Sequence, residues 1–107
     1  METKFIPGPW SFVPSVPEEG YECFWIENGV QRITCIDGPQ NAEREAIARL
    51  IAAAPELFEA LQDARAFLTD PQIGQWSYME SDAFYRDLNE AVEKINAALA
   101  KATGEQA

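Results

Sequence analysis

The spacing of hydrophobic residues changes near residue 40. Before Gln40 the apolar residues form short runs, and five of the seven prolines lie in this half. From Asn41 onward apolar residues recur every three or four positions among Ala, Glu, Leu and Arg. Short broken runs are typical of strands, and the second spacing is typical of amphipathic helices. We therefore predict a single α+β domain with a β-rich half at 1–40, a helical half at 41–102 and a frayed tail at 103–107.

The stretch "YECFWIENGVQRITCI" predicts a β-hairpin. Two β-prone runs flank Asn28-Gly29, and Asn-Gly is a preferred two-residue turn because both residues tolerate positive φ. A two-residue turn places Trp25 opposite Arg32 and Phe24 opposite Ile33. Upstream, prolines enclose Trp10 to Val13 and limit it to a short edge strand. The prediction is a three-stranded antiparallel sheet between Trp10 and Ile36.

Cys23 and Cys35 are the only cysteines, and the chain contains no histidine. In the predicted register Cys23 faces Thr34 and Cys35 faces Glu22, so the two sulfurs point to opposite faces of the hairpin. We therefore expect two free thiols and no disulfide. Two isolated thiols without histidine also argue against a zinc site in this chain, and we expect neither a metal nor a cofactor.

Three helices are predicted in the second half, at 41–54, 55–68 and 81–101. Asn41 and Ser81 are suitable N-caps. Pro55 lacks a backbone donor and disfavours a helical conformation at Ala54, so a helix break is expected there. A set of apolar side chains around this break is expected to pack against the sheet: Leu50, Ile51, Leu57, Phe58 and Leu61.

The charge balance narrows the choice of partner. The chain has 18 acidic and 8 basic residues, for a net charge of -10. This charge disfavours direct binding to nucleic acid or to an anionic membrane. It either keeps the domain soluble or provides a surface for a basic partner, and both interpretations stay open. No signal peptide or membrane span is recognisable, so we expect a cytoplasmic protein.

The chain has the motifs "FIPGPW" near its start and "ARLIAAAPELFEAL" after the hairpin. These two motifs resemble those of a group of small phage and prophage proteins. Members of that group typically carry His-Thr before Pro-Gly-Pro-Trp, where this chain has Phe5-Ile6, and Leu where it has Phe58. Residues 43–47 also lengthen the approach to the second motif. The resemblance extends to about Leu68, and it implies a phage origin.

This resemblance implies a class of function by analogy. Small acidic phage proteins without catalytic residues often bind and disable a host protein, and anti-CRISPR proteins are the best-known class. The analogy rests on origin and composition, and it assigns no residue a role.

The residue types and motifs of the chain favour a binding function over catalysis. Without histidine the usual general base near neutral pH is missing. The pairs Asp82/Asp87 and Glu56/Glu59 are predicted on the solvent side of their helices, and nothing near Cys35 is recognisable as an activating base. No phosphate loop or dinucleotide fingerprint occurs. We predict that the protein is not an enzyme.

Two candidate partner-binding surfaces follow from the helical half. One is an acidic array along two helices, which consists of Glu56, Glu59, Asp63, Asp87, Glu90 and Glu93. The other is the loop after Leu68, where Trp76 and Tyr78 are suited to anchor a protein interface. The alternatives are a solvated helix face for the acids and a lid on the core for the aromatic residues.

Two functions are carried forward. The first is a phage-derived inhibitor of a host defence complex, which binds a basic surface on a host protein or ribonucleoprotein. The second is a phage accessory or regulatory module that binds phage proteins or itself, and a homodimer is compatible with it. The sequence leaves the target and the oligomeric state undefined.

Overall fold

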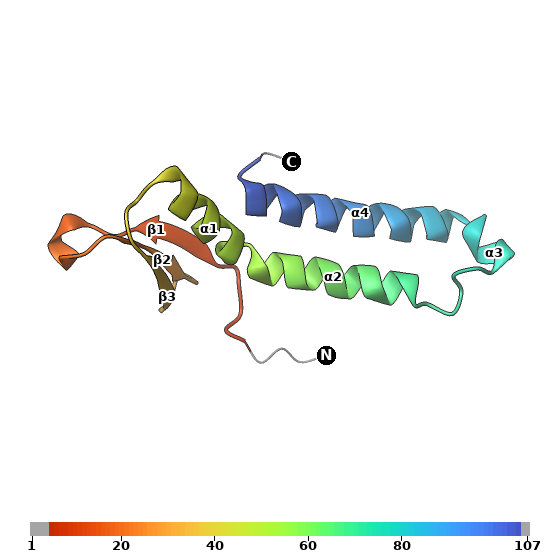
Figure 1. Ribbon diagram of the computed structural model, residues 1–107. Coiled ribbons are helices and arrows are strands. Elements are labelled where there is room, and N and C mark those ends of the chain that lie inside the picture. Colours follow the sequence, from red (N-terminus) through yellow and green to blue (C-terminus); the bar gives the residue numbers. More distant parts are fainter. Residues whose placement is uncertain (1–4, 106–107) are drawn as a thin grey trace.

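The computed structural model describes residues 5–105 and confirms the α+β fold class. Figure 1 shows a small sheet at one end of the molecule and two long helices side by side that extend away from it. The strands are β1 (Ser11–Pro14), β2 (Cys23–Glu27) and β3 (Arg32–Asp37), and a 3-10 turn, η1 (Pro17–Glu19), follows β1. The helices are α1 (Ala42–Ala52), α2 (Ala54–Leu68), α3 (Trp76–Met79) and α4 (Asp82–Thr103).

The sheet is antiparallel with the order β1-β2-β3, as predicted. β1 occupies an edge, and Pro14 is its last residue. A proline is tolerated there because an edge strand has one side without a ladder partner.

The predicted two-residue turn is wrong. β2 and β3 pair with Trp25 opposite Cys35 and Glu27 opposite Arg32, so the loop spans 28–31. The Asn28 side chain accepts hydrogen bonds from the backbone N–H groups of Val30 (3.0 Å) and Gln31 (2.9 Å). Such a side-chain turn competes with a tight hairpin turn, because it satisfies the loop's own donors.

The register also changes the placement of the cysteines. Cys23 lies opposite Asp37, and Cys35 lies opposite Trp25. Directly opposed residues share a face of the sheet, so both thiols lie on the same face and the predicted opposite placement is wrong. Both cysteines are nevertheless free, as expected.

The core lies between one face of the sheet and α1. Phe24 and Ile26 of β2 pack with Ala48 and Ala52 of α1, and Trp10 and Ile51 are among the partly buried residues around them. The alanines let the helix backbone approach the strands closely. α1 is therefore the helix that positions the rest of the helical half relative to the sheet.

The helix break is confirmed just before Pro55. α1 ends at Ala52, Ala53 lies between the helices with φ -86° and ψ -1°, and α2 begins at Ala54. Pro55 cannot donate to the carbonyl of Ile51 four residues earlier, so the helical ladder is interrupted there. The new ladder starts with the bond from Leu57 N–H to the Ala53 carbonyl, 2.9 Å long.

The predicted packing of the central motif against the sheet is largely wrong. Ile51 joins the core, but the side chains of Leu50 and Leu61 are 53% and 69% exposed. Phe58 meets Phe5 edge to face, with ring centroids 5.2 Å apart. The break turns α2 away from the sheet, which leaves the side chains of α2 beyond its reach (Figure 1). Leu50 lies on α1, but two positions from the buried Ala48 and Ala52, and therefore on the opposite side of that helix.

α4 returns antiparallel to α2 and makes the helical half a hairpin (Figure 1). Ser81 caps α4 as predicted, and its Oγ accepts from Phe84 N–H. The helix continues to Thr103 and ends at Gly104, whose φ of 80° is left-handed. It therefore runs two residues beyond the predicted end at 101.

The resulting molecule is elongated. Its extents are 62 × 28 × 17 Å and its radius of gyration is 18.0 Å. A compact domain of 100 residues has a radius of gyration of about 13 Å. The difference arises because α2 and α4 extend away from the sheet as a single layer, with α1 at one end of the hairpin and α3 at the other (Figure 1).

Candidate functional site

The α2–α4 hairpin carries most of the predicted partner-binding residues. Ala60 of α2 and Ala98 of α4 are buried where the two helices meet. Small side chains bring the helix axes close together. We call this line of contact between α2 and α4 the seam, and longer side chains beside it can reach from one helix to the other. The acidic residues of the hairpin divide into those that bridge the seam and those that face solvent.

Three of the predicted acids are bound across or along this seam. Glu56 accepts from Lys101 Nζ at 2.7 Å, and Asp63 forms an ion pair with Lys94 Nζ at 2.5 Å. Asp87 accepts from the hydroxyl of Tyr78 at 2.8 Å. The expectation that Glu56 and Asp87 are simply solvated is therefore wrong, because each has a defined partner inside the hairpin.

These contacts shift the pKa values of the groups that pair with the acids. The bond to Asp63 raises the pKa of Lys94, since it stabilises the charged amine. The pKa of Tyr78 is raised mainly by burial and further by the bond to Asp87. At neutral pH both groups therefore keep the protons that they donate.

The other three predicted acids, Glu59, Glu90 and Glu93, are exposed. Glu90 also lines a shallow depression of about 300 Å³ between the helices. Its charged lining residues are Asp63, Asp70, Asp87, Glu90 and Lys94. With four carboxylates and one amine, the depression has a negative charge that Lys94 only partly offsets.

The predicted aromatic anchors are separated by the structure. Both lie in α3, a single turn at the end of the hairpin far from the sheet (Figure 1). Trp76 is 75% exposed, whereas Tyr78 is buried and holds Asp87. Trp76 is thus available to a partner, and Tyr78 serves as part of the hairpin's own packing.

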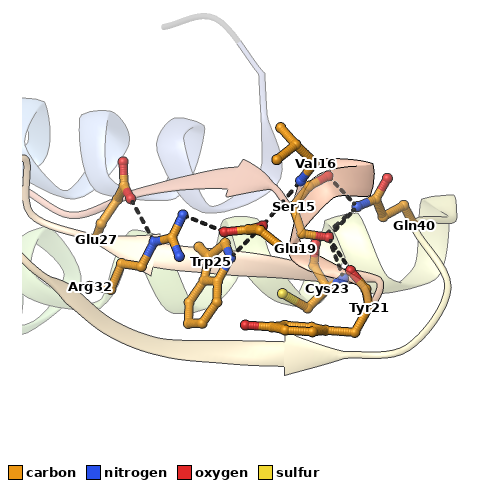
Figure 2. A network of polar contacts seen from close by, with 9 residues as sticks. All are labelled: Ser15, Val16, Glu19, Tyr21, Cys23, Trp25, Glu27, Arg32 and Gln40. Carbon is orange, nitrogen blue, oxygen red and sulfur yellow. Dashed lines mark hydrogen bonds and ion pairs between the residues drawn. The ribbon is translucent and has the colours of Figure 1, made fainter.

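A second polar surface, on the sheet, was missed by the sequence interpretation. Figure 2 shows Glu19 of η1 at the centre of a network of contacts. Its carboxylate accepts from Trp25 Nε1 at 3.1 Å and pairs with Arg32 at 2.8 Å, and the Arg32 guanidinium lies 4.1 Å from the centre of the Trp25 ring. The bond from Trp25 is the largest cause that lowers the pKa of Glu19.

The same network fixes the loop between β1 and β2. Ser15 Oγ accepts from Cys23 N–H at 3.0 Å and donates to the Tyr21 carbonyl at 2.9 Å (Figure 2). The side-chain amide of Gln40 donates to Ser15 and to the Cys23 carbonyl. Sequence reasoning could not find these contacts, because they depend on the register and on residues up to 25 positions apart.

Within residues 5–105 the structure has neither a metal-ligand cluster nor a membrane-spanning helix. This part of the chain has no cluster of three or more cysteine, aspartate or glutamate side chains able to hold a metal ion. Its helices are also too short or too polar to cross a membrane.

Comparison with known proteins identifies the family. No curated protein and no solved structure matches the chain significantly. A family model described as Salmonella phage P22 protein Y8K6 matches residues 1–106, which includes the C-terminal helices that lie outside the two sequence motifs. The chain therefore belongs to this family of phage proteins.

Proposed function

We propose that the protein acts without catalysis, by binding a basic partner through the acidic face of its helical hairpin. This acidic face consists of Glu59, Glu90 and Glu93, together with the depression lined by Asp63 and Asp87. The observation that carries the proposal is that α2 and α4 bring carboxylates distant in sequence onto one side of the hairpin. A concentrated negative surface attracts and orients a positively charged partner.

The partner class that we infer is a host defence complex with a basic nucleic-acid channel, such as a CRISPR effector. Membership of a phage family and a net charge of -10 both support a target of this kind. An acidic protein can occupy a channel built for phosphates without binding nucleic acid itself. The exposed Trp76 supplies an apolar anchor at the end of the same hairpin.

The chemistry of the remaining groups supports binding without turnover. Burial raises the pKa of Cys35, which keeps its thiol protonated and weakens it as a nucleophile. Glu56 and Asp63 pair with lysines that lie in the same hairpin. These carboxylates contribute to folding, which leaves fewer groups that could act as an acid and a base.

An alternative function is a phage accessory module that binds phage proteins or itself. The observation that favours it is the set of exposed leucines on the hairpin, including Leu61 and Leu68. Apolar side chains of this kind suit a protein interface and do not attract a basic channel.

The experiment has two stages. The tagged protein is first used to capture partners from host lysate, with and without phage infection. Association with the captured partner is then measured over a range of salt for the parent and for the triple variant Glu59→Gln, Glu90→Gln, Glu93→Gln. A matched control changes three exposed acids elsewhere, Glu18, Glu22 and Glu43, to Gln and has the same net charge.

The proposal expects a basic host complex in the eluate. The acidic-face variant should associate at least tenfold more slowly with a flatter salt dependence, because steering charges act on the association rate. The control should stay close to the parent. Trp76→Ala should mainly speed dissociation. Equal association rates for the two triple variants, or phage proteins as the sole partners, would overturn the proposal.

A further inference from the structure

The helical hairpin has an apolar face that no described part of the chain covers. In α2 the residues Leu57, Leu61 and Leu68 are spaced by four and seven positions, and in α4 the residues Val92, Ile95 and Leu99 are spaced by three and four. Such spacings place each set on one side of its helix. We call these six residues the leucine face. Leu61, Leu68 and Leu99 are 69%, 66% and 51% exposed, and Val92 is 44% exposed.

Both halves of the leucine face lie on the same side of the hairpin. In α2, Leu57 directly follows the seam residue Glu56, and Leu61 directly follows the seam residue Ala60. In α4 the seam residue Ala98 likewise precedes Leu99. Each step of one residue rotates the direction of the side chain by about 100° around the helix axis. Because the helices are right-handed and antiparallel, equal turns from their shared seam point to the same side of the hairpin.

This face is also the side of the hairpin without negative charge. The acids of α2 and α4 either bridge the seam, as Glu56 and Asp63 do, or project to the acidic face. Asn89 and Asn96 flank the leucine face on the outer side of α4. In a chain with a net charge of -10, two copies can approach through this face while their carboxylates stay apart.

We infer that the leucine face binds the leucine face of a second copy, and that the protein is a dimer with a four-helix bundle at its centre. A two-fold axis that lies in the plane of the interface turns the face of one copy onto the face of the other and brings the same patch of both copies together, as a self-complementary interface requires. Four helices with apolar residues spaced by three and four positions match the packing of such bundles. A basic partner is a poorer occupant, because the face has no acid to meet it.

The available area is sufficient for a modest dimer. α2 has 15 residues, and a helix of that length covers about 22 Å by about 10 Å with its side chains. Two such helices in each copy bury on the order of 1,000 Å² over both copies, which is about the minimum for a specific interface.

The test measures the mass of the full-length protein by sedimentation equilibrium up to about 100 µM, well above the Kd of a micromolar dimer. The parent should show twice the monomer mass of 12.0 kDa. The variant Leu61→Asp, Leu68→Asp should be monomeric with unchanged helix content, because both side chains are exposed in the monomer. The matched control Ala66→Asp, Ala97→Asp adds the same charge at exposed positions off the leucine face and should stay dimeric.

A second variant distinguishes loss of the dimer interface from loss of folding. Leu61→Met, Leu68→Met keeps an apolar face of similar volume and should remain dimeric, with a dimer Kd within about tenfold of the parent's. A monomeric parent throughout the concentration range would overturn the inference, and so would a dimer that survives the aspartate pair. Binding of the monomer to phosphatidylcholine vesicles through this face would also overturn it. None of these results bears on the acidic face, so the two proposals fail independently.

Discussion

Gly8 lies directly against Pro55. A Cβ atom added to Gly8 would be 2.8 Å from the Cβ of Pro55, closer than non-bonded carbon atoms approach each other in folded proteins. The Pro-Gly-Pro-Trp segment therefore packs on the helix break in the central motif, and these two stretches of the sequence touch in space. Phe5 and Phe58 form a second contact between the same segments. Each motif thus forms part of the other's packing surface.

Gly8→Ala should destabilise the protein by about 1–3 kcal/mol, because the new methyl group overpacks this contact. The measurement is urea denaturation followed by circular dichroism. In a Pro55→Gly background the opposing Cβ is gone, so the same change should cost less. Equal costs in both backgrounds would show that the contact with Pro55 is not the cause.

Lys101 connects three segments through its amine. Nζ donates to Glu56 at 2.7 Å and to the Trp10 carbonyl at 2.9 Å. The second carboxylate oxygen of Glu56 is buried without a hydrogen-bond partner among the described residues. Lys101→Met should therefore lower the free energy of unfolding by about 1–2 kcal/mol, a moderate loss because both side chains remain a third exposed.

The double variant Lys101→Met, Glu56→Gln provides the control for this ion pair. Glu56→Gln removes the charge that Lys101→Met leaves unpaired, so the double variant should be more stable than the sum of the single changes predicts. Strict additivity in thermal denaturation would mean that the two groups do not depend on each other.

Glu19 should make stability depend on acidic pH. Its pKa is lowered from 4.5, mainly by the bond from Trp25, so the ionised form is favoured in the folded protein. The stabilisation is fully present above pH 4.5 and is lost as the pH falls through the lowered value. Denaturation with Trp fluorescence across pH 2 to pH 7 should show a smaller pH dependence for Glu19→Gln than for the parent. An unchanged pH profile would contradict the role of this carboxylate.

Asn28→Ala should weaken the β2–β3 loop. The change removes two hydrogen bonds from backbone donors of Val30 and Gln31, and a loss of about 1 kcal/mol is expected. Gln31→Ala is the matched control, because Gln31 contributes its backbone to this turn. The measurement is the free energy of unfolding of both variants, obtained by chemical denaturation. The loop assignment would be wrong if the control lost as much stability as Asn28→Ala.

The sequence by itself determined the order and type of the three strands and the three long helices, while the short turns η1 and α3 were predicted as loops. The change of spacing near residue 40 predicted strands followed by helices, Pro55 predicted the break, and Ser81 predicted the start of α4. These features depend on backbone chemistry and local periodicity, which neighbouring residues supply. The net charge of -10 is likewise a property of the amino-acid composition, independent of how the chain folds.

The tertiary structure decided the register, the shape and the surfaces. The Asn28 side chain set a four-residue loop, which moved Cys23 and Cys35 onto one face of the sheet. The turn of α2 away from the sheet exposed Leu61, which its apolar character had placed in the core. The seam paired Glu56 with Lys101, 45 positions away. Such contacts depend on how the elements pack in space, and a helical or strand period fixes only which side of one element a residue occupies.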